Sequence, residues 1–562
     1  GLMKRLKILR AVRAGLVIVA GSLIIGCMTI ETVPLVTDVD WSEYRVEEYT
    51  PSPEDWRKEI IYFLVTDRFA DGDPTNNDMG VGEYNPEDVE YYHGGDFRGI
   101  VERLDYIKAT GSTAIWLTPP VANQWLSPTY AGGVRYSGYH GYWAHDYYDT
   151  DAHFGTLNEY RVMVREAHER GLYVIQDIVP NHMGDFYSED GEDINQDGIP
   201  PRPAAPFDDV DRRHEFFHFG GTTEQTRGFF SLLDDMHTEN EYAIDQLIEI
   251  FKFWIRETDI DGYRIDTVKY VPIEFWERFI PEILDYAASL GKDDFLIFGE
   301  AYDFDNVIAL RLEESDEFTG AYTGTADDPL FPSMLDFSVA GAISKVYTGM
   351  SVSGLSREQG SFELIAERFS DRVRNYYAPH ARDQRVVFFD NHDMLRFMGE
   401  GKADQDEDLL TMAVTTLYTL PGIPQLYYGT EQAFHQPEAI KNGQPGTDNR
   451  QDLWDSGYAV NTPVFRHIAR MADVRLSYDA LTLGSFESIV ADEGPLFLYA
   501  RRHESGDALV VINRGDESLT IDATAYLDGA VFDLYEGGDE AIDDAVAIPV
   551  PAEGFRVLGV SP

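Results

Sequence analysis

Short apolar runs alternate with longer amphipathic stretches along most of this 562-residue chain. Eight runs have the length and composition of buried strands, and the stretches between them have the apolar spacing of helices. The predicted strands are Ile60–Thr66, Thr113–Thr118, Tyr173–Val179, Gly262–Val268, Phe295–Glu300, Met334–Phe337, Val386–Asn391 and Ile423–Tyr428. This alternation predicts a parallel sheet, either closed as a (β/α)8 TIM barrel or open and doubly wound.

Polar residues gather at the carboxyl ends of these predicted strands. An open sheet does not predict such a gathering, whereas a closed barrel builds its active site there. The residues are Asp177, Asn181 and His182 at the end of the third run, Arg264 and Asp266 in the fourth, Glu300 at the end of the fifth, and Asn391, His392 and Asp393 at the end of the seventh. The pattern therefore favours the barrel, an α/β fold.

Two segments depart from the alternation. Residues 182–238 are rich in Gly, Pro and Asp and are too long for an ordinary loop, so they predict a subdomain inserted after the third strand. Residues 477–562 contain short strands between acidic turns, which predicts a C-terminal antiparallel β-sandwich. The catalytic barrel then covers residues 56–181 and 239–476, and we expect a monomer.

The N-terminus has the pattern of an export signal. Five basic residues precede an apolar core, and the chain's one cysteine, Cys27, follows in Ile24-Ile25-Gly26-Cys27. This segment resembles the lipobox of bacterial lipoproteins. Residues 1–27 are therefore predicted to be a signal peptide and 28–55 a tether. The protein is expected to be exported and held by an N-terminal lipid anchor at the bacterial cell surface or the periplasmic face of a membrane.

The charge balance excludes one class of partner. There are 45 Lys and Arg residues against 99 Asp and Glu residues, a formal net charge of −54. Nucleic-acid binding depends on basic groups that neutralise phosphates, so we expect no nucleic acid as a partner. An acidic surface is typical both of exported proteins and of salt-adapted ones.

Three carboxylates, Asp266, Glu300 and Asp393, are predicted at the mouth of the barrel. Glycoside hydrolysis needs one carboxylate as nucleophile or base and one carboxylic acid as proton donor. Arg264 beside Asp266 is expected to keep that carboxylate ionised. Glu300, in an apolar strand end near other acids, is expected to have a raised pKa, as a general acid requires.

Four ordered motifs make the resemblance to a family specific. DIVPNH, GYRIDTVKY, GE and FFDNHD resemble the motifs of the α-amylase family, glycoside hydrolase family 13. They occupy Asp177–His182, Gly262–Tyr270, Gly299–Glu300 and Phe388–Asp393, and related matches extend over residues 56–455. The resemblance implies a retaining mechanism with Asp266 as nucleophile, Glu300 as acid/base and Asp393 as stabiliser of the transition state.

The same resemblance implies the residues that bind sugar. Some surround the cleaved sugar, Tyr142 is the aromatic platform beneath it, and others contact the sugars beyond the cleavage point. The implied set is Arg264, His182, His392, Tyr142, His140, Lys269, Tyr302 and Arg450.

The segment DGDPTNND carries many oxygen donors at short spacing, which suits Ca²⁺, although a solvated turn has the same composition. With the GGD sequence downstream, it resembles the calcium site of cyclodextrin glucanotransferases. The ligands implied are Asp71, Asp73, Asn76, Asn77, Gly94 and Asp96.

A second calcium of the family ties the inserted subdomain to the barrel. The resemblance implies Asn181 and Asp235 as ligands, together with a backbone oxygen of the residue after Lys269. That residue is Tyr270 here, where the family has histidine, which leaves this second site open.

Three functions follow from the resemblance. The first is endo-hydrolysis of α-1,4-glucosidic bonds in starch, glycogen or maltodextrins. The second is a cyclodextrin glucanotransferase or maltogenic transglycosylase on the same α-glucans. Against it, one β-domain follows the barrel, and the segment Ser231–Met236 lacks a central aromatic residue. The third is a non-catalytic glycan-binding relative, which the presence of all three carboxylates disfavours.

Overall fold

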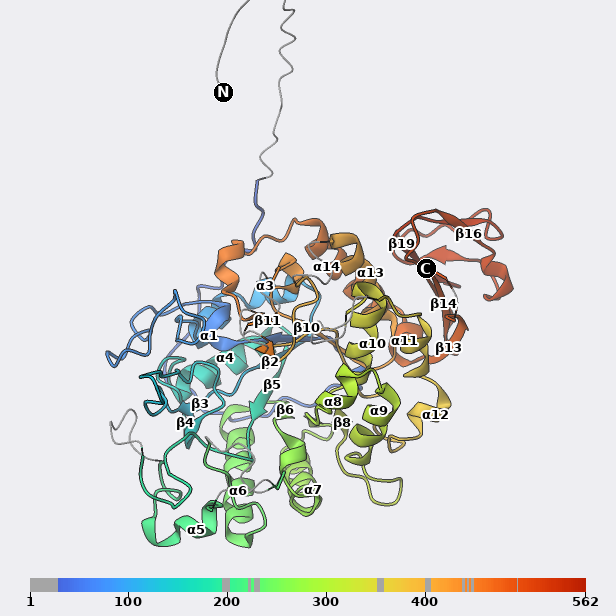
Figure 1. The fold of residues 1–562 in the computed structure, drawn as a ribbon. Helices are drawn as coiled ribbons and strands as arrows, with labels where there is room; N and C mark the ends of the chain where they lie inside the picture. Colours follow the sequence, from blue (N-terminus) through green and yellow to red (C-terminus); the bar gives the residue numbers. More distant parts are fainter. Residues whose placement is uncertain are drawn as a thin grey trace, which may run out of the picture.

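The computed structural model describes residues 29–561, except 195–202, 221–223, 227–232, 351–357, 400–405, 437–439, 442–443, 446–448 and 493. The predicted signal peptide, residues 1–27, lies outside the described residues. The centre of the molecule is a parallel sheet in the order β8-β7-β6-β5-β2-β1-β10-β9. A parallel bridge between Leu335 and Val386 joins its two edges, so the sheet closes into a barrel (Figure 1).

Each barrel strand overlaps one of the eight predicted runs, which confirms the (β/α)8 fold, although β6, β8 and β9 end earlier than predicted. They are β1 (Ile61–Leu64), β2 (Ala114–Leu117), β5 (Tyr173–Ile178), β6 (Gly262–Ile265), β7 (Leu296–Gly299), β8 (Ser333–Met334), β9 (Val386–Val387) and β10 (Ile423–Tyr427). Inside the barrel, the rings of Phe63 and Trp116 stack with their centroids 3.6 Å apart. The strands are buried on both faces, as expected where helices cover a parallel sheet.

Amphipathic helices surround the barrel, and local sequence sets their ends. The first turn of α4 has a capping box, in which Thr156 and Glu159 each accept from the other's backbone amide. Helix α6 begins after Asn240, whose side chain accepts from Tyr242 N, and ends at Asp259 in the left-handed region (φ 63°). The longer helices are α4 (Leu157–Glu169), α6 (Glu241–Thr258), α7 (Ile273–Ser289), α9 (Leu312–Ala321), α10 (Phe337–Thr348), α13 (Glu407–Thr419) and α14 (Pro463–Ser477).

Shorter elements connect these parts. The short helices are α1 (Thr66–Phe69), α2 (Phe97–Glu102), α3 (Leu104–Ala109), α5 (Arg213–Phe216), α8 (Phe304–Ile308), α11 (Glu363–Glu367), α12 (Asp371–Arg374) and α15 (Asp479–Leu483). Strands β3 (Val121–Asn123) and β4 (Ala144–Thr150) pair as a hairpin beside the barrel.

The inserted segment consists mostly of turns, as its composition predicts. Its regular elements among the described residues are η2 (Val210–Arg212) and α5. Two antiparallel bridges, His182 with Asp235 and Phe217 with Met236, hold its ends beside each other. These bridges place inserted residues next to the active-site motif that contains His182.

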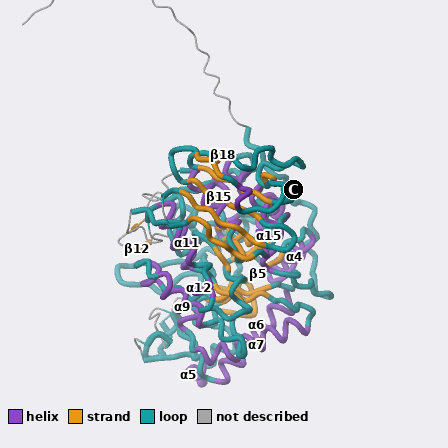
Figure 2. Tube along the Cα trace, turned by 90° about the vertical axis from the view of Figure 1, so that its right-hand side faces the viewer, coloured by secondary structure: helices purple, strands orange, loops and turns teal. Residues whose placement is uncertain are grey.

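The C-terminal domain is antiparallel, as predicted. One sheet has the order β13-β14-β15-β19-β17, and a second pairs β16 with β18. Its strands are β13 (Ser485–Val490), β14 (Leu496–Arg502), β15 (Ala508–Asn513), β16 (Leu519–Ile521), β17 (Phe532–Asp533), β18 (Ile548–Val550) and β19 (Gly554–Gly559). Figure 2 faces this domain and shows it at the opposite end of the molecule from α5.

Residues 29–55 differ from the predicted tether, because the described part of this segment packs on the barrel. Val36 is buried, and its amide donates to Glu102 O at 3.0 Å. Further along, Thr50 Oγ1 donates to Asp259 Oδ2 at 2.8 Å, at the end of α6. Hydrogen bonds to helix ends therefore hold a segment whose composition suggests a linker. Among the described residues, no helix combines the length and apolar content needed to cross a membrane.

Candidate active site

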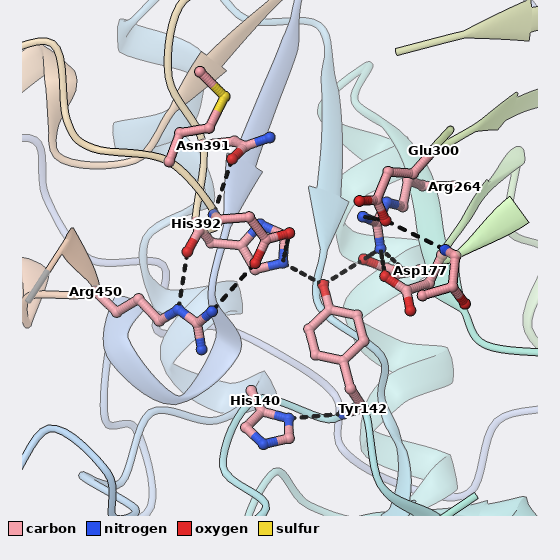
Figure 3. A network of polar contacts seen from close by, with 12 residues as sticks. His140, Tyr142, Asp177, Arg264, Glu300, Asn391, His392 and Arg450 are labelled. Carbon is pink, nitrogen blue, oxygen red and sulfur yellow. Dashed lines mark hydrogen bonds and ion pairs between the residues drawn. The ribbon is translucent and has the colours of Figure 1, made fainter. Parts of the chain in front are cut away.

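One buried guanidinium joins the carboxylates of three neighbouring strands. Arg264 Nη1 donates to both oxygens of Asp177 at 2.9 and 3.0 Å and to Asp266 Oδ1 at 2.8 Å. Its Nη2 donates to Glu300 Oε2 at 2.7 Å. Arg264 and Asp177 are direct partners in the parallel pairing of β6 with β5, and Glu300 follows the adjacent β7 (Figure 3). The closed barrel thus places the carboxylates of Asp177, Asp266 and Glu300 around one cation, the guanidinium of Arg264.

The backbone after β6 turns Asp266 toward β7. The strand ends at Ile265, earlier than the predicted Val268, so Asp266 lies in a turn instead of on the strand face that carries Arg264. Thr267 adopts a left-handed conformation (φ 53°), which is uncommon for a β-branched residue. Its amide lies 3.3 Å from Glu300 Oε2. This strained turn directs the Asp266 carboxylate and a backbone donor toward the same point.

The pKa of Glu300 is higher than that of Asp266, which is the order required if Glu300 is the general acid. Burial raises the pKa of Glu300 to about 8, opposed by Arg264 and reinforced by the negative charge of Asp266. Burial also raises the pKa of Asp266, to about 6, but Arg264 and a hydrogen bond from Glu300 lower it. The expected effect of Arg264 is present, although burial exceeds it. Because the two groups interact strongly, the pair shares its titration steps, with the proton held on Glu300 near neutral pH.

Asp393 is the most accessible of the three carboxylates, with 35% of its side chain exposed against 11% for each of the other two. Burial opposes its ionisation, but the guanidinium groups of Arg450 and Arg264 bring its pKa below the usual value. Arg450 Nη2 lies 3.4 Å from Asp393 Oδ1, and Arg450 Nε donates to His392 O at 3.2 Å. Asp393 is therefore an ionised acceptor that faces the cleft.

Tyr142 connects the two sides of the site. Its hydroxyl donates to Asp177 Oδ2 at 2.8 Å, so it accepts the Nε2–H of His392 at 2.7 Å. The two rings stack at 5.5 Å between centroids. Burial lowers the pKa of His392 to about 3, and that of His182 to about 4, which keeps both imidazoles neutral. In this state they serve as hydrogen-bonding groups and do not exchange protons near neutral pH.

The remaining predicted sugar-binding residues line the same cleft, which has a volume of about 710 Å³. His140 Nδ1 accepts from Tyr142 N at 3.0 Å, so its proton is on Nε2. Lys269 Nζ donates to Tyr302 O at 2.6 Å, and the Tyr302 ring stacks on Phe337 at 4.0 Å. The cleft brings together Asp266, Glu300, Asp393, His140, Tyr142, His182, Lys269, Tyr270, Tyr302, His392 and Arg450.

Two residues of the site had no role assigned from the sequence, although Asp177 belongs to the polar residues predicted at the strand ends. Asp177 is fully buried and accepts from Arg264, Tyr142 and Trp116, so it positions both the guanidinium and the aromatic platform. Its place at the start of the DIVPNH motif was the available signal. Leu233 lines the cleft from the inserted subdomain. The sequence pointed only to its segment, Ser231–Met236, through the absence of a central aromatic residue.

The residues of the first predicted calcium site fit an oxygen-preferring cation. Asn76 Oδ1 and Asn77 Oδ1 are buried and have no hydrogen-bond partner among the described residues, while Asn77 Nδ2 donates to Asp71 Oδ2 at 2.7 Å. Gly94 (φ 109°) lies so close that a Cβ there would meet the Asn77 amide at 2.4 Å. Buried carbonyl oxygens without donors are costly unless a cation or water meets them.

Two of the predicted ligands have additional roles there. Asp96 caps α2, and its carboxylate accepts from the amides of Gly72, Asp73 and Gly99. Asp73 accepts from Thr75 N and Oγ1. The loop 71–78 is thus tied to the start of α2 through Asp96, which shapes the site around the two asparagine oxygens.

The residues of the second predicted calcium site do not fit that ion. Asp235 Oδ2 lies 2.6 Å from His218 Nδ1, and Asn181 Nδ2 donates to His182 Nδ1 at 3.0 Å. Neither residue has an orphaned buried oxygen, in contrast to the first site. Tyr270 is in the cleft wall, and its amide donates to Thr267 O. The imidazole groups of His218 and His182 lie beside Asp235 and Asn181, where further oxygen ligands were expected.

The fold and this site define a glycosidase with a (β/α)8 barrel, and comparison with known proteins identifies the family. Residues 63–317 match the model of the α-amylase catalytic domain. The chain belongs to the α-amylase family, glycoside hydrolase family 13, a family of enzymes.

Several relatives match most of the chain. A β/α-amylase of Paenibacillus polymyxa is 34% identical over 484 residues, covering 83% of this chain and 34% of that protein. A cyclomaltodextrin glucanotransferase of Klebsiella oxytoca is 29% identical over 497 residues, covering 82% of this chain and 71% of the relative. This chain therefore spans about a third of the length of the Paenibacillus protein.

Among solved structures, that of CldA superposes on this chain with a TM-score of 0.73 at 27% sequence identity. The alignment covers 91% of this chain and 100% of CldA. It is described as the first cyclomaltodextrin glucanotransferase with a three-domain ABC distribution. Its three-domain form shows that the presence of one β-domain after the barrel does not separate hydrolases from transferases. One of the two sequence arguments against a transferase is therefore removed.

Proposed function

We propose that this protein hydrolyses α-1,4-glucosidic bonds of starch-like glucans with retention of configuration, acting within the chain. The observation that carries the proposal is the arrangement of Asp266 and Glu300 on adjacent nitrogens of Arg264, with a hydrogen bond between the two carboxyls. Carboxyls in such contact lack the wide separation that inverting enzymes need for a water molecule. The arrangement supports a double displacement.

In this mechanism the Asp266 carboxylate attacks the anomeric carbon while Glu300 protonates the leaving oxygen. Glu300 then takes a proton from the water that hydrolyses the glycosyl-enzyme. Arg264 keeps Asp266 ionised and Asp177 keeps Arg264 in place. Asp393 accepts hydrogen bonds from sugar hydroxyls, and the neutral His140 and His392 lie beside it in the cleft wall.

The cleft supports an α-glucan as substrate. Its aromatic groups present ring faces to sugars, and its acidic and imidazole groups suit hydroxyls. Tyr142 lies next to the reacting carboxylates, and Tyr302 and Phe304 lie further along the wall. Relatives named as amylases and as cyclomaltodextrin glucanotransferases make a glucanotransferase the second candidate.

Leu233 favours hydrolysis over cyclisation. A cyclising transferase must hold the glucan end in the acceptor region long enough to exclude water, for which a stacking aromatic ring suits better than an aliphatic side chain. Leu233 and Asp234 are the two middle residues of the segment Ser231–Met236, and Leu233 lines the cleft. We therefore expect water to compete successfully as the acceptor.

A product time course on soluble starch tests this proposal. We expect reducing ends to increase from the first minutes, with linear maltooligosaccharides of mixed length that retain the α-configuration. Abundant cyclic products would replace the proposal with the transferase. A constant number of reducing ends, together with retained glucan binding, would assign a non-catalytic role.

We further propose that Ca²⁺ binds at Asp71, Asp73, Asn76, Asn77, Gly94 and Asp96. There it would neutralise clustered acids and tie the loop 71–78 to α2. Binding to the folded state alone stabilises it, by about 2.7 kcal/mol at a concentration 100 times Kd. We expect chelator to lower the thermal midpoint and Ca²⁺ to restore it.

The variant Asn77→Ala is expected to lose most of this calcium-dependent stabilisation, because it removes a buried oxygen donor. Asn85→Ala, an exposed side chain further along the same loop region, is the control and should keep the wild-type response. Equal calcium responses in both variants, measured by differential scanning calorimetry, would refute the assignment of the ligands.

A further inference from the structure

Two imidazoles and one carboxylate converge where the inserted subdomain meets the start of α6. One potential ligand atom of His218, of His237 and of Glu239 lies within 4.8 Å of each of the others. The side chains of His218 and Glu239 are 13% and 29% exposed, so an ion can reach them from solvent. None of the three residues belongs to the active site or to the predicted calcium sites.

Backbone pairing fixes the two histidines side by side. His218 N donates to Asp235 O at 3.0 Å, and His237 N donates to Phe216 O at 2.6 Å, around the antiparallel bridge of Phe217 with Met236. The two imidazole ring centroids lie 4.4 Å apart. The pair is therefore held in place by hydrogen bonds that do not involve its side chains.

Each imidazole has a hydrogen-bond acceptor at Nδ1, the nitrogen that a metal would leave protonated. His218 Nδ1 lies 2.6 Å from Asp235 Oδ2, and His237 Nδ1 lies 3.1 Å from His214 O. These oxygens accept, so each Nδ1 carries a proton, and a metal ion would bind at the Nε2 of each ring. A metal-binding histidine commonly donates its other N–H to a carboxylate or carbonyl in this way, which orients the ring.

The outer nitrogen of His218 faces a carboxylate. Its Nε2 is buried and lies 2.9 Å from Glu239 Oε2. Burial opposes a positive charge on His218, but its contacts with Asp235 and Glu239 raise its pKa to about 9, so a second proton occupies Nε2 near neutral pH. A metal ion bound at this position would replace that proton.

We propose that His218, His237 and Glu239 bind a divalent transition-metal ion of the Zn²⁺ class, with Asp235 orienting His218. Two imidazole nitrogens and one carboxylate oxygen suit zinc, whereas Ca²⁺ and Mg²⁺ prefer oxygen ligands alone. Three protein ligands leave one position for water. The ion would join the inserted segment to the residue before Asn240, the N-cap of α6, and brace Asp235, which pairs through its backbone with His182 of the active site.

Titration of the metal-free full-length protein with Co²⁺, in the presence of Ca²⁺ to fill oxygen sites, tests this proposal. We expect one equivalent to give the visible absorption of tetrahedral cobalt, and Zn²⁺ to displace it. Zn²⁺ should also raise the thermal midpoint. His237→Gln should abolish the visible band, and Asp235→Asn should weaken binding by about 10–100-fold, as loss of an orienting partner does.

His503→Gln, a histidine of the C-terminal domain, is the matched control and should bind as the wild type does. The thermal midpoint of each metal-free variant establishes that it is folded. Absence of the visible band in wild-type protein would show that the cluster is a proton-mediated ion pair and would overturn the proposal. Unchanged cobalt binding in folded His237→Gln protein would overturn it as well. Neither readout depends on catalytic activity.

Discussion

Asp266→Asn is expected to abolish turnover of starch while leaving the protein folded. The change removes the nucleophile, and loss of a group that forms the covalent intermediate costs about 10⁴-fold or more in kcat. The fold should survive because Arg264 keeps its contacts with Asp177 and Glu300. The amide is nearly isosteric with the carboxylate, so the cleft should still bind maltooligosaccharides.

Initial rates measure the loss of turnover. Circular dichroism and the thermal midpoint measure whether the variant is folded. Asp245→Asn, on the exposed face of α6, is the matched control and should retain full activity. A variant at Asp266 that is folded and keeps more than about one per cent of wild-type kcat contradicts the role of nucleophile, since such a loss is far too small for that group.

Glu300→Gln has the second-largest expected effect and also changes the pH profile. The variant cannot protonate the leaving oxygen, which costs about 10²–10⁴-fold on starch. An aryl maltooligoside with an acidic phenol leaving group needs little protonation, so its bond should still be cleaved to form the glycosyl-enzyme. The defect should therefore be much smaller for the burst of phenol release than for starch hydrolysis.

The wild-type pH profile follows from the two raised pKa values. Asp266, with a pKa near 6, must be ionised, so activity should fall as the pH drops below about 6. Glu300, with a pKa near 8, must be protonated, so activity should fall as the pH rises above about 8. The alkaline limb should be absent from phenol release by Glu300→Gln.

Glu282→Gln, which removes a partly exposed carboxylate on α7, paired with Arg278 and Lys252, is the control for this substitution. It should keep both limbs and the wild-type rate. An unchanged alkaline limb in the Glu300 variant, or equal losses on starch and on the aryl substrate, would assign the acid role to another group.

Most of the barrel could be predicted because each of its strands and helices is encoded by the pattern of apolar and polar residues within that segment. Each strand is a short apolar run with polar residues at its end, and each long helix has an apolar stripe, so hydrophobic burial determines the elements one by one. The catalytic carboxylates were recognisable for a related reason. Asp266 and Glu300 end strands that are neighbours in the chain, and parallel order places their ends together.

The sequence-based predictions failed where a contact joins residues that lie far apart in the chain. Residues 29–55 look like a linker in composition, yet Thr50 bonds to Asp259 some 200 residues away, and Val36 bonds to Glu102. Asp177 reads as an ordinary buried acid until Arg264 and Tyr142 are seen to share it. Asp235 was a candidate calcium ligand because nothing in the chain near it shows that His218 contacts its carboxylate.

By itself, the sequence determined the order of strands and helices, the catalytic motifs and the acidic charge, because these depend on residue type and spacing. The tertiary structure alone decided which side chains share a partner. It placed three carboxylates on Arg264 and left two asparagine oxygens without donors at Asn76 and Asn77. It also aligned His218 with His237 across a bridge. Contacts between distant segments depend on how the closed barrel and its insertion pack, and no local pattern encodes that packing.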